Sequence, residues 1–559
     1  MFIDAWVRNR TVMVTTASGN GSGPVVHRFP VRPVAIVADP NGDFVTFDGT
    51  RVKRILYRTH RAHARAAKRK SRLDWEGDID PALVVLEREF AHSEPARPFR
   101  AFVDIEVDVD PERGFATPDD PHAPVVSFAV SVPGGTTGVL LCPPGSRSGD
   151  VALSVGERFL VVEDEKELLS ILVDSVIGAS DVWCGWNSSF FDLPYLVRRL
   201  ERLDLAELTT RLSVAGERPV ERTVEKWGTK RLTYETRGRV HLDYLDLYRR
   251  FVRREMHSYA LEHVAREETG EGKVAYTGSL GELWRCDPGK FAEYNLRDVE
   301  LLEAIESRHR LVDLAVGLAH EARVPLRAVL GTVALVENAI ILEAHGRGYV
   351  VPRRKWYMDT GDEEVRSDTD VSGAAVFEPK TGIHELVGCI DVNSLYPSVI
   401  RTLNASPETV VGQLDLSRTR RTIEEKMASG MSLTTATADL FGTVEYRLVA
   451  ERSKESVVLY TVGLPPWLDP GRHEMPARDL AEIVFDPEIP LSISAYGTLF
   501  RTDVEGVVPG LLHRWYEERK RMQKAARTWR RLEEGIPLPD DLAAELAARL
   551  ANGVPSTGV

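Results

Sequence analysis

The chain has 559 residues, a formal net charge of −13 at pH 7 and 43% hydrophobic residues. This length is sufficient for several domains with full cores, and the composition is that of an ordinary soluble globular protein. The acidic balance excludes nucleic-acid binding by bulk charge, although a local basic channel around an acidic metal site is compatible with it. No uninterrupted apolar run approaches the roughly 20 residues of a membrane span, so we expect no membrane partner.

Two further features favour a cytoplasmic protein. Residues 1–10 lack the basic start and the apolar core of a signal peptide. The four cysteines, Cys142, Cys184, Cys286 and Cys389, stand singly and without metal-site spacing. They are therefore expected to be free thiols in a reducing compartment.

The first 100 residues show short strand and turn patterns and then a basic, helix-prone stretch with interspersed alanines. Its cationic residues are Arg51, Lys53, Arg54, Arg58, Arg61, Arg65, Lys68, Arg69, Lys70 and Arg72. Such a helix face is either merely solvated or contacts phosphates, and both interpretations remain open. The polar, Pro-containing segment 94–98 predicts the first domain boundary.

Apolar and acidic residues alternate from Val103 to Val109, which predicts a half-buried strand. Asp104 and Glu106 then point to one face of the strand, while the apolar residues between them pack on the other. Two neighbouring carboxylates repel each other. Either solvent screens them on an exposed edge strand, or cations lie between them.

The next patterns predict strands at 125–132 and 138–142 and an amphipathic helix at 166–177. An apolar strand then ends at Gly185 and leads through a loop to a helix start at 193–200, with Pro194 tolerated in the first turn. Asp192 therefore lies at a strand-to-helix junction, a common position for a functional side chain.

Residues 221–240 alternate in polarity and contain two glycine turn signals, which predicts a protruding β-hairpin with a basic and aromatic tip. An ordinary surface hairpin remains the alternative to a functional one. A strand is expected at 240–247 and a helix from Pro288 to about Arg308. Tyr294 and Asp298 are four residues apart on that helix, so they share one face.

Strand Asp-x-Glu, loop Asn-x-x-x-Phe-Asp and helix Tyr-x-x-x-Asp occur in this order within an alternating α/β segment. Four carboxylates can hold two divalent cations about 4 Å apart around a phosphodiester. The set resembles the three motifs of the proofreading 3′–5′ exonuclease of family B DNA polymerases. The resemblance implies that Asp104, Glu106, Asp192 and Asp298 hold two Mg²⁺ ions, with Mn²⁺ as an alternative. It also implies that Tyr294 orients the attacking water and that Asn187 contacts the substrate.

Residues 388–400 (GCIDVNSLYPSVI) predict an apolar strand that delivers Asp391 and then turns into a helix. Backbone N–H groups at such a turn can receive phosphate oxygens. The segment resembles the first palm motif of family B polymerases, and its continuation over 401–409 resembles the replicative enzymes of large tailed phages. The resemblance implies that the Asp391 carboxylate and the Val392 carbonyl face a polymerase metal. Three further residues would lie under the incoming nucleotide, namely Ser394, Leu395 and Tyr396.

Residues 515–531 (WYEERKRMQKAARTWRR) form a strongly basic helix pattern that resembles the first fingers helix of the family. Arg519 matches the triphosphate-binding arginine of that helix. A solvated basic face is the alternative, and both remain open.

The family pattern continues with a second fingers helix that carries Lys and Tyr, a Tyr-x-Asp-Thr-Asp turn and a thumb, but none of these follows Arg531. Residues 367–370 (SDTD) imitate the acidic turn, yet they precede Asp391 in a polar loop. One carboxylate cannot hold a polymerase metal pair. We therefore expect the N-terminal polypeptide of a split or truncated family B replicative polymerase, whose second chain supplies the rest. The alternatives are a stand-alone 3′–5′ DNA exonuclease and a catalytically silent DNA-binding remnant.

The resemblance predicts a multidomain α/β fold. An N-terminal domain would occupy residues 1–100 and be completed by about 312–362. An RNase H-like exonuclease domain would follow over 101–311, then a partial palm over 363–505 and the start of the fingers over 506–559. The expected substrates are primer-template DNA, single-stranded 3′ ends and dNTPs, and the expected location is the host-cell cytoplasm if a phage encodes the chain.

Overall fold

The structure is a computed structural model, and the residues that it describes fall into several ranges. They are 1–47, 49–57, 72–73, 76, 78–110, 112–153, 155–226, 229–352, 380–389, 391, 394–414, 428, 456–461, 469–494 and 497–535. The chain divides into two compact units. The first comprises residues 1–35, 55–72 and 76–342, and the second comprises 36–54, 73–75 and 343–559. The domain boundaries expected from the sequence stay predictions.

The first unit begins with a three-stranded antiparallel sheet in the order β1-β2-β3. Helix α2 packs against β1 and β2, and Phe2, Val14 and Leu86 are buried in the small core between them. Asp80 starts this helix because its side chain accepts a hydrogen bond from the N–H of Ala82. The elements are β1 (Phe2–Arg8), β2 (Thr11–Thr16), β3 (Val25–Pro30) and α2 (Pro81–Glu89).

A mixed six-stranded sheet in the order β13-β12-β11-β8-β14-β17 is the centre of this unit. Strand β8 pairs antiparallel with β11 and parallel with β14, so it lies in the middle of the sheet. Its burial alternates as the sequence predicts, and Val103 and Ile105 are buried. The strands are β8 (Arg100–Val107), β11 (Val125–Val132), β12 (Gly135–Leu141), β13 (Phe159–Val162), β14 (Val182–Gly185) and β17 (Val240–Asp243).

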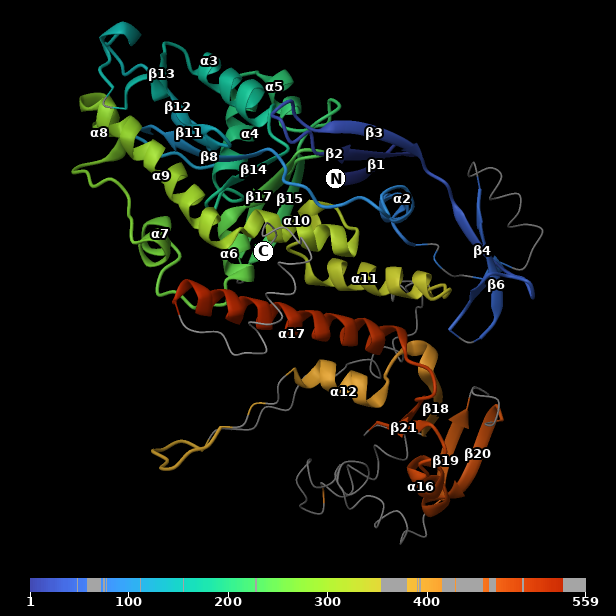
Figure 1. The fold of residues 1–559 in the computed structure, drawn as a ribbon. Helices are drawn as coiled ribbons and strands as arrows, with labels where there is room; N and C mark the ends of the chain where they lie inside the picture. Colours follow the sequence, from blue (N-terminus) through green and yellow to red (C-terminus); the bar gives the residue numbers. More distant parts are fainter. Residues whose placement is uncertain are drawn as a thin grey trace. The chain divides into compact units, whose positions relative to one another are not determined.

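Helices cover both faces of this sheet, with α9 along one side and α3, α4 and α5 on the other (Figure 1). Helix α9 packs against β8, β11 and β12. It starts at Pro288 because the Asp287 side chain accepts a hydrogen bond from the N–H of Lys290, 3.0 Å away. The helices are α3 (Glu165–Ser170, continued as a π-helix over Ile171–Ile177), α4 (Asp192–Arg202), α5 (Ala206–Arg211), α6 (Tyr244–Phe251), α7 (Leu261–Thr269), α8 (Leu280–Cys286), α9 (Pro288–His309) and α10 (Leu311–Ala322).

Two hairpins extend from this unit, and one of them was predicted. The predicted hairpin forms between β15 (Val220–Lys226) and β16 (Thr229–Glu235), although its tip at 227–228 lies outside the described residues. A short hairpin of β9 (Val109–Asp110) and β10 (Gly114–Phe115) follows β8. Helix α11 (Thr332–Gly346) ends in the second unit.

The strand predicted over 240–247 is wrong in its second half. Strand β17 ends at Asp243, and α6 begins at Tyr244. The reason is local, since the Asp243 side chain accepts a hydrogen bond from the N–H of Leu245 and so caps the helix.

The second unit contains an antiparallel five-stranded sheet in the order β20-β19-β18-β22-β21, with α16 packed against β20 and β21. Helix α12 packs against the long helix α17. The elements are α12 (Leu395–Leu403), β18 (Val410–Leu414), β19 (Ser456–Thr461), β20 (Gly471–Pro476), α16 (Ala477–Phe485), β21 (Leu491–Ile493), β22 (Thr498–Arg501) and α17 (Val507–Glu533). A separate four-stranded sheet has the order β5-β6-β4-β7, from β4 (Val34–Ala38), β5 (Phe44–Val45), β6 (Arg51–Leu56) and β7 (Arg72–Leu73).

Two further expectations for this part of the chain are corrected. Arg51, Lys53 and Arg54 lie on strand β6 and not on a helix, because Val52 packs inward in the strand alternation while its neighbours point outward. Arg72 lies on strand β7, and the rest of the basic stretch, residues 58–71, lies outside the described residues. The strand expected from residue 388 to Asp391 lies partly outside the described residues, and its described residues 388, 389 and 391 are not in a strand.

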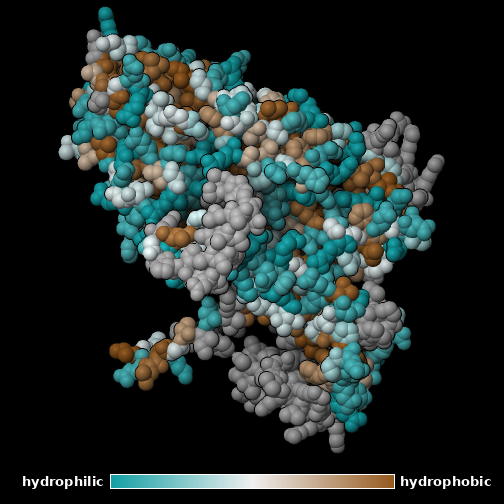
Figure 2. All heavy atoms as spheres, in the orientation of Figure 1, coloured by the Kyte–Doolittle hydropathy of each residue, from teal (hydrophilic) through white to brown (hydrophobic). Residues whose placement is uncertain are grey.

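Most of the visible surface is hydrophilic, with scattered apolar patches (Figure 2). In the second unit, exposed apolar side chains lie on two helices, namely Leu395, Tyr396 and Val399 on α12 and Met522, Trp529 and Leu532 on α17. Of the helices in the described part of the chain, none combines the length and the apolar character that crossing a membrane requires.

Replacing Gly185 by Ala should destabilise the first unit. A Cβ atom there would lie 2.7 Å from Ser188 Cβ and 2.8 Å from the carbonyl oxygen of Val103, so the chain on both sides must shift. We expect a loss of about 1–3 kcal/mol in the free energy of unfolding, measured by urea denaturation. The control is Gly149→Ala, because a Cβ at Gly149 would meet no atom within 4 Å. Equal stability of the two variants would contradict this close packing.

Candidate active sites

Carboxylates from β8 and α9 meet at one face of the six-stranded sheet. Asp104 and Glu106 project from β8 and Asp298 from α9, and one ligand atom of each lies within 4.8 Å of the other two. The strand alternation and the helix spacing that the sequence predicts therefore bring these three side chains together.

The other predicted exonuclease residues lie close to this group. Asp192 is the first residue of α4, and its Oδ1 accepts a hydrogen bond from the N–H of Ile105 at 3.4 Å. Tyr294 lies one helical turn before Asp298 on α9, and both contact the same ammonium group. Asn187 is exposed in the loop before α4, and its side chain makes none of the described contacts with the acidic group.

The electrostatics of the group favour protonated carboxyls in the absence of a cation. Burial, reinforced by Asp298, raises the pKa of Glu106 to about 8. Burial also raises the pKa of Asp192 to about 7, and burial together with the neighbouring carboxylates raises the pKa of Asp104 well above its usual range. Burial raises the pKa of Asp298 as well, although an ammonium group opposes this shift. Four neighbouring carboxyl groups therefore favour their neutral form.

Lys273 provides that ammonium group, and sequence reasoning missed it. Its Nζ lies 2.6 Å from Asp298 Oδ2 and 3.1 Å from the hydroxyl oxygen of Tyr294. Burial opposes the charge of Lys273, but Asp298 and Asp104 outweigh burial and raise its pKa. The lysine lies in the loop after α7, where no periodic pattern or motif marks it.

Asn295 is a second residue that sequence reasoning missed, and here a signal existed. It is three residues before Asp298 and therefore on the same helix face. Its Nδ2 donates a hydrogen bond to Asp104 Oδ2 at 2.8 Å, and its Oδ1 accepts one from the Ser127 hydroxyl at 2.6 Å. Asn295 thereby fixes the Asp104 carboxylate between β11 and α9.

The donor set fits a hard divalent cation. All the candidate ligands are carboxylate oxygens, which Mg²⁺ and Mn²⁺ prefer. Asp298 Oδ1 is buried and accepts no hydrogen bond among the described residues, so one oxygen remains available to a ligand.

The second candidate site involves the start of α12. Ser394 has a left-handed backbone with φ 54° and precedes the helix, so the predicted turn into a helix is confirmed. Leu395 and Tyr396 are exposed, with 50% and 73% of their surface accessible. Asp391 is exposed too, whereas Val392 lies outside the described residues. Arg519 Nη1 on α17 donates a hydrogen bond to Ser394 Oγ at 3.3 Å, which brings two of the predicted nucleotide-binding residues together.

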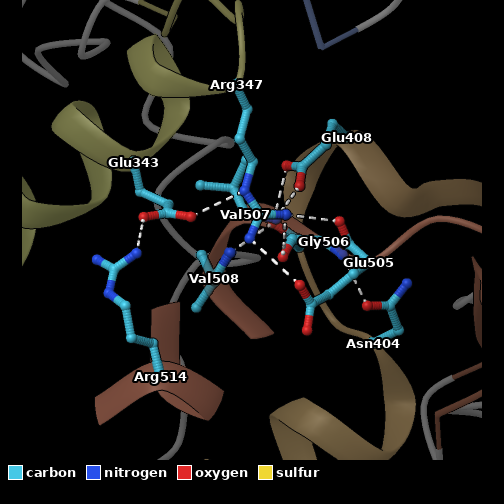
Figure 3. Close-up of polar contacts among 10 residues, drawn as sticks. Glu343, Arg347, Asn404, Glu408, Glu505, Gly506, Val507, Val508 and Arg514 are labelled. Atoms are coloured by element: carbon cyan, nitrogen blue, oxygen red, sulfur yellow. Dashed lines mark hydrogen bonds and ion pairs between the residues drawn. The ribbon is translucent and has the colours of Figure 1, made fainter. Parts of the chain in front are cut away.

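The N-terminus of α17 is fixed by side chains from the segment after α12 (Figure 3). The N–H of Gly506 donates to Asn404 Oδ1 at 2.9 Å, that of Val507 donates to Glu408, and that of Val508 donates to Ser406 Oγ at 3.3 Å. These contacts satisfy N–H groups that a helix start leaves free. They join α17 to the end of α12.

An ion-pair chain reinforces this junction (Figure 3). Arg347 Nη1 donates hydrogen bonds to the carbonyl oxygens of Glu505 and Gly506 at 2.9 and 3.2 Å. Glu343 accepts a hydrogen bond from Arg347 Nε at 2.8 Å and another from Arg514 Nη1 at 2.6 Å. The N-terminal part of α17 is therefore held both by residues 404–408 and by Glu343 and Arg347. These contacts fix the direction of the helix that carries Arg519.

Comparison with known proteins gives matches over both regions. The family model "DNA polymerase family B, exonuclease domain" matches residues 43–264, and "DNA polymerase family B" matches residues 324–534. The chain is similar to the DNA-directed DNA polymerases of Enterobacteria phage T4, at 32% identity over 232 residues, and of Escherichia phage RB69, at 27% over 255 residues. It is also 29% identical over 256 residues to DNA polymerase 1 of Pyrococcus abyssi.

These three matches cover 42%, 45% and 45% of this chain but only 25%, 27% and 31% of the respective relatives. The chain therefore matches about a quarter to a third of the length of these relatives.

Without divalent ions, the acidic group should make folding less favourable as the pH rises. The pKa of Glu106 is about 8 in the folded chain against an ordinary value of 4.5. The folded state therefore binds more protons than the unfolded state between about pH 5 and 8, and the free energy of unfolding falls across this window.

The measurement is urea unfolding in EDTA at several pH values, for the wild type and for Glu106→Gln. We expect the advantage of Glu106→Gln over the wild type to grow as the pH rises from 5 to 8, because the amide cannot ionise. The difference between the two chains removes the contribution of unrelated titrating groups. A difference that stays constant with pH would contradict the raised pKa.

Proposed function

This chain belongs to family B of the DNA polymerases, and we propose that it is the N-terminal portion of a replicative enzyme of the phage type with 3′–5′ proofreading exonuclease activity of its own. The observation that carries the proposal is the convergence of Asp104, Glu106 and Asp298 within 4.8 Å, with Asp192 beside them. Residues from all three expected exonuclease motifs therefore lie close together in the first unit.

In the proposed exonuclease reaction, the four carboxylates bind two divalent ions, most simply Mg²⁺. Bound there, such ions activate water and stabilise the charge that develops on the phosphodiester. The chain's own residues orient the reactants. Tyr294 places its hydroxyl beside the carboxylates, and Lys273 holds both Tyr294 and Asp298. Asn187 is proposed to contact the single-stranded 3′ end.

The proposed polymerase half-site lies in the second unit. Asp391 would provide one of two metal-binding carboxylates, with the carbonyl of Val392 beside it, and Ser394, Leu395 and Tyr396 would lie under the incoming dNTP. The contact between Arg519 and Ser394 supports this assignment, because it brings a cation to the turn where triphosphate oxygens would lie. The reaction would be in-line attack of the primer 3′-OH on the α-phosphate of the dNTP, which breaks the bond to the β-phosphate and releases pyrophosphate.

A second polypeptide is part of the proposal. A pair of metal ions needs more than the single carboxylate of Asp391. The exposed apolar side chains of α12 and α17 also favour a covering chain, which we propose carries the remaining palm, fingers and thumb. The proposed substrates are primer-template DNA, single-stranded 3′ ends and dNTPs, and the proposed location is the cytoplasm of a host cell.

Replacing Asp104 and Glu106 together by Ala should reduce digestion of single-stranded DNA 3′ ends to the uncatalysed background, because the cations lose two ligands. The measurement is Mg²⁺-dependent release of mononucleotides from a 3′-labelled oligonucleotide. Asp119→Ala removes an exposed carboxylate from the same unit and serves as the control. Wild-type nuclease activity in the double variant would refute the metal assignment.

Polymerisation should require the partner chain and Asp391. This chain, the proposed partner, a primed template, dNTPs and Mg²⁺ should together extend the primer, and Asp391→Ala should abolish extension. Arg519→Ala should lower kcat/KM for dNTP by roughly 10- to 100-fold, the value of a charge-assisted contact, without changing exonuclease activity. The control is Arg521→Ala, since Arg521 pairs with Glu518 on the same helix. Extension by this chain alone would contradict the need for a partner.

A further inference from the structure

The loop that delivers Asp192 is held by a carboxylate from the neighbouring strand. Asp243, the last residue of β17, is buried and accepts three backbone hydrogen bonds. Its Oδ1 accepts from the N–H groups of Asn187 and Leu245 at 3.1 and 3.0 Å, and its Oδ2 accepts from the N–H of Ser189 at 3.0 Å. Both oxygens therefore face the segment of backbone that joins β14 to α4.

This loop has a conformation that needs such support. Asn187 has a left-handed backbone with φ 59°, a conformation that glycine adopts readily and asparagine adopts at a smaller cost than most other residues. Backbone of this kind persists where surrounding contacts fix it. Asp243 provides those contacts on either side of Ser188, through the N–H groups of Asn187 and Ser189.

His241 adds a third point of attachment. It precedes Asp243 by two residues on β17, so both side chains lie on one face of the strand. Its Nε2 lies 2.8 Å from Ser188 Oγ. Burial lowers the pKa of His241 to about 3, so the ring is neutral and can accept the hydroxyl proton of Ser188. Two side chains on one face of β17 therefore hydrogen-bond to three consecutive residues of the loop, 187–189.

Asp192 follows this loop after only two phenylalanines. No side chain caps the start of α4 at Phe191, so the position of Asp192 depends on the path of the preceding backbone. Within that path, the N–H of Leu193 donates to the carbonyl oxygen of Ser188 at 3.0 Å, which ties the first turn of α4 directly to the held residues.

We propose that Asp243 is a positioning residue for the exonuclease, which sets Asp192 in register with Asp104 and Glu106 by fixing residues 187–189. This inference rests on the proposed exonuclease function. Among the described contacts, Asp243 makes no hydrogen bond to the four carboxylates of the site. It acts on Asp192 through the loop, besides the effect of its charge, which raises the pKa of Asp192.

The first test is Asp243→Asn. The amide keeps one acceptor oxygen and turns an N–H donor towards a backbone N–H, so at least one of the three hydrogen bonds is lost. A displacement of a catalytic group by about 1 Å can cost about 10²-fold in rate. We expect kcat on single-stranded DNA to fall about 10- to 100-fold, KM for DNA to stay within about threefold, and half-maximal activity to need several-fold more Mg²⁺.

Asp181→Asn is the matched control. Asp181 is also fully buried, and it accepts backbone hydrogen bonds from Ser18, Gly19 and Phe99 at 3.0, 3.0 and 2.8 Å. It lies immediately before β14, at the other end of that strand from residues 187–189. Its replacement should lower the melting temperature, as that of Asp243 should, while leaving kcat and the Mg²⁺ requirement within about twofold. A purely structural role for Asp243 predicts the same behaviour in both variants.

Asp243→Glu keeps the charge and both acceptor oxygens but extends them by one methylene, and it serves if Asp243→Asn does not fold. We expect a folded chain by circular dichroism with kcat at least fivefold below the wild type. Wild-type kcat and Mg²⁺ dependence in a folded Asp243 variant, together with inactive Asp192→Asn, would overturn the positioning role and leave the proposed function standing. An active Asp192→Asn would instead refute the proposed function itself.

Discussion

Mutual repulsion among buried carboxylates is the constraint on which the first unit depends. Asp104, Glu106 and Asp298 lie close enough to share a cation, and burial raises the pKa of each. Neighbouring carboxylates add to the shift at Asp104 and Glu106, whereas Lys273 opposes it at Asp298. Lys273 balances part of this charge. A cluster of this kind lowers the free energy of unfolding, so packing elsewhere in the sheet has to compensate for the loss. The other face of β8 does so, because Val103 and Ile105 are buried in the main core.

The same repulsion explains why polar side chains outside the carboxylate group hold the elements that carry the carboxylates. The four carboxylates come from three local structures, namely strand β8, helix α9 and the start of α4, and each of these structures has its own attachment. Asn295 holds Asp104, the cap at Asp287 fixes the start of the helix that carries Asp298, and Asp243 holds the loop before Asp192. Repelling groups move apart unless their supports are rigid, so such attachments are what a preorganised metal site requires.

The sequence predicts those parts of this arrangement that follow from short-range periodicity. The alternation over 103–109 predicts strand β8 and the shared face of Asp104 and Glu106, and the spacing of Tyr294 and Asp298 predicts their shared helix face. Lys273 could not be found in this way, because a single loop lysine reaches the site only through the tertiary fold. Asp243 shows a different limit. Its apolar neighbours suggest a longer strand, but its side chain caps a helix, and a cap depends on a contact that apolar periodicity does not contain. A third limit is shown by Arg51, Lys53 and Arg54. Their segment has good helix propensity but forms strand β6, in which Val52 is buried.

The two candidate sites differ in how much of their chemistry one compact unit supplies. All four carboxylates of the first site come from the first unit, together with the cation that balances them. In the second unit, the described contacts fix the helix that carries Arg519. Helix α17 is anchored by Asn404, Glu408 and Arg347, and Arg519 reaches Ser394. Asp391 is exposed, as are Leu395 and Tyr396 at the start of α12. Under the proposal above, the polymerase site takes its second acidic ligand from a further chain, whereas all four carboxylates of the proposed exonuclease site come from one unit.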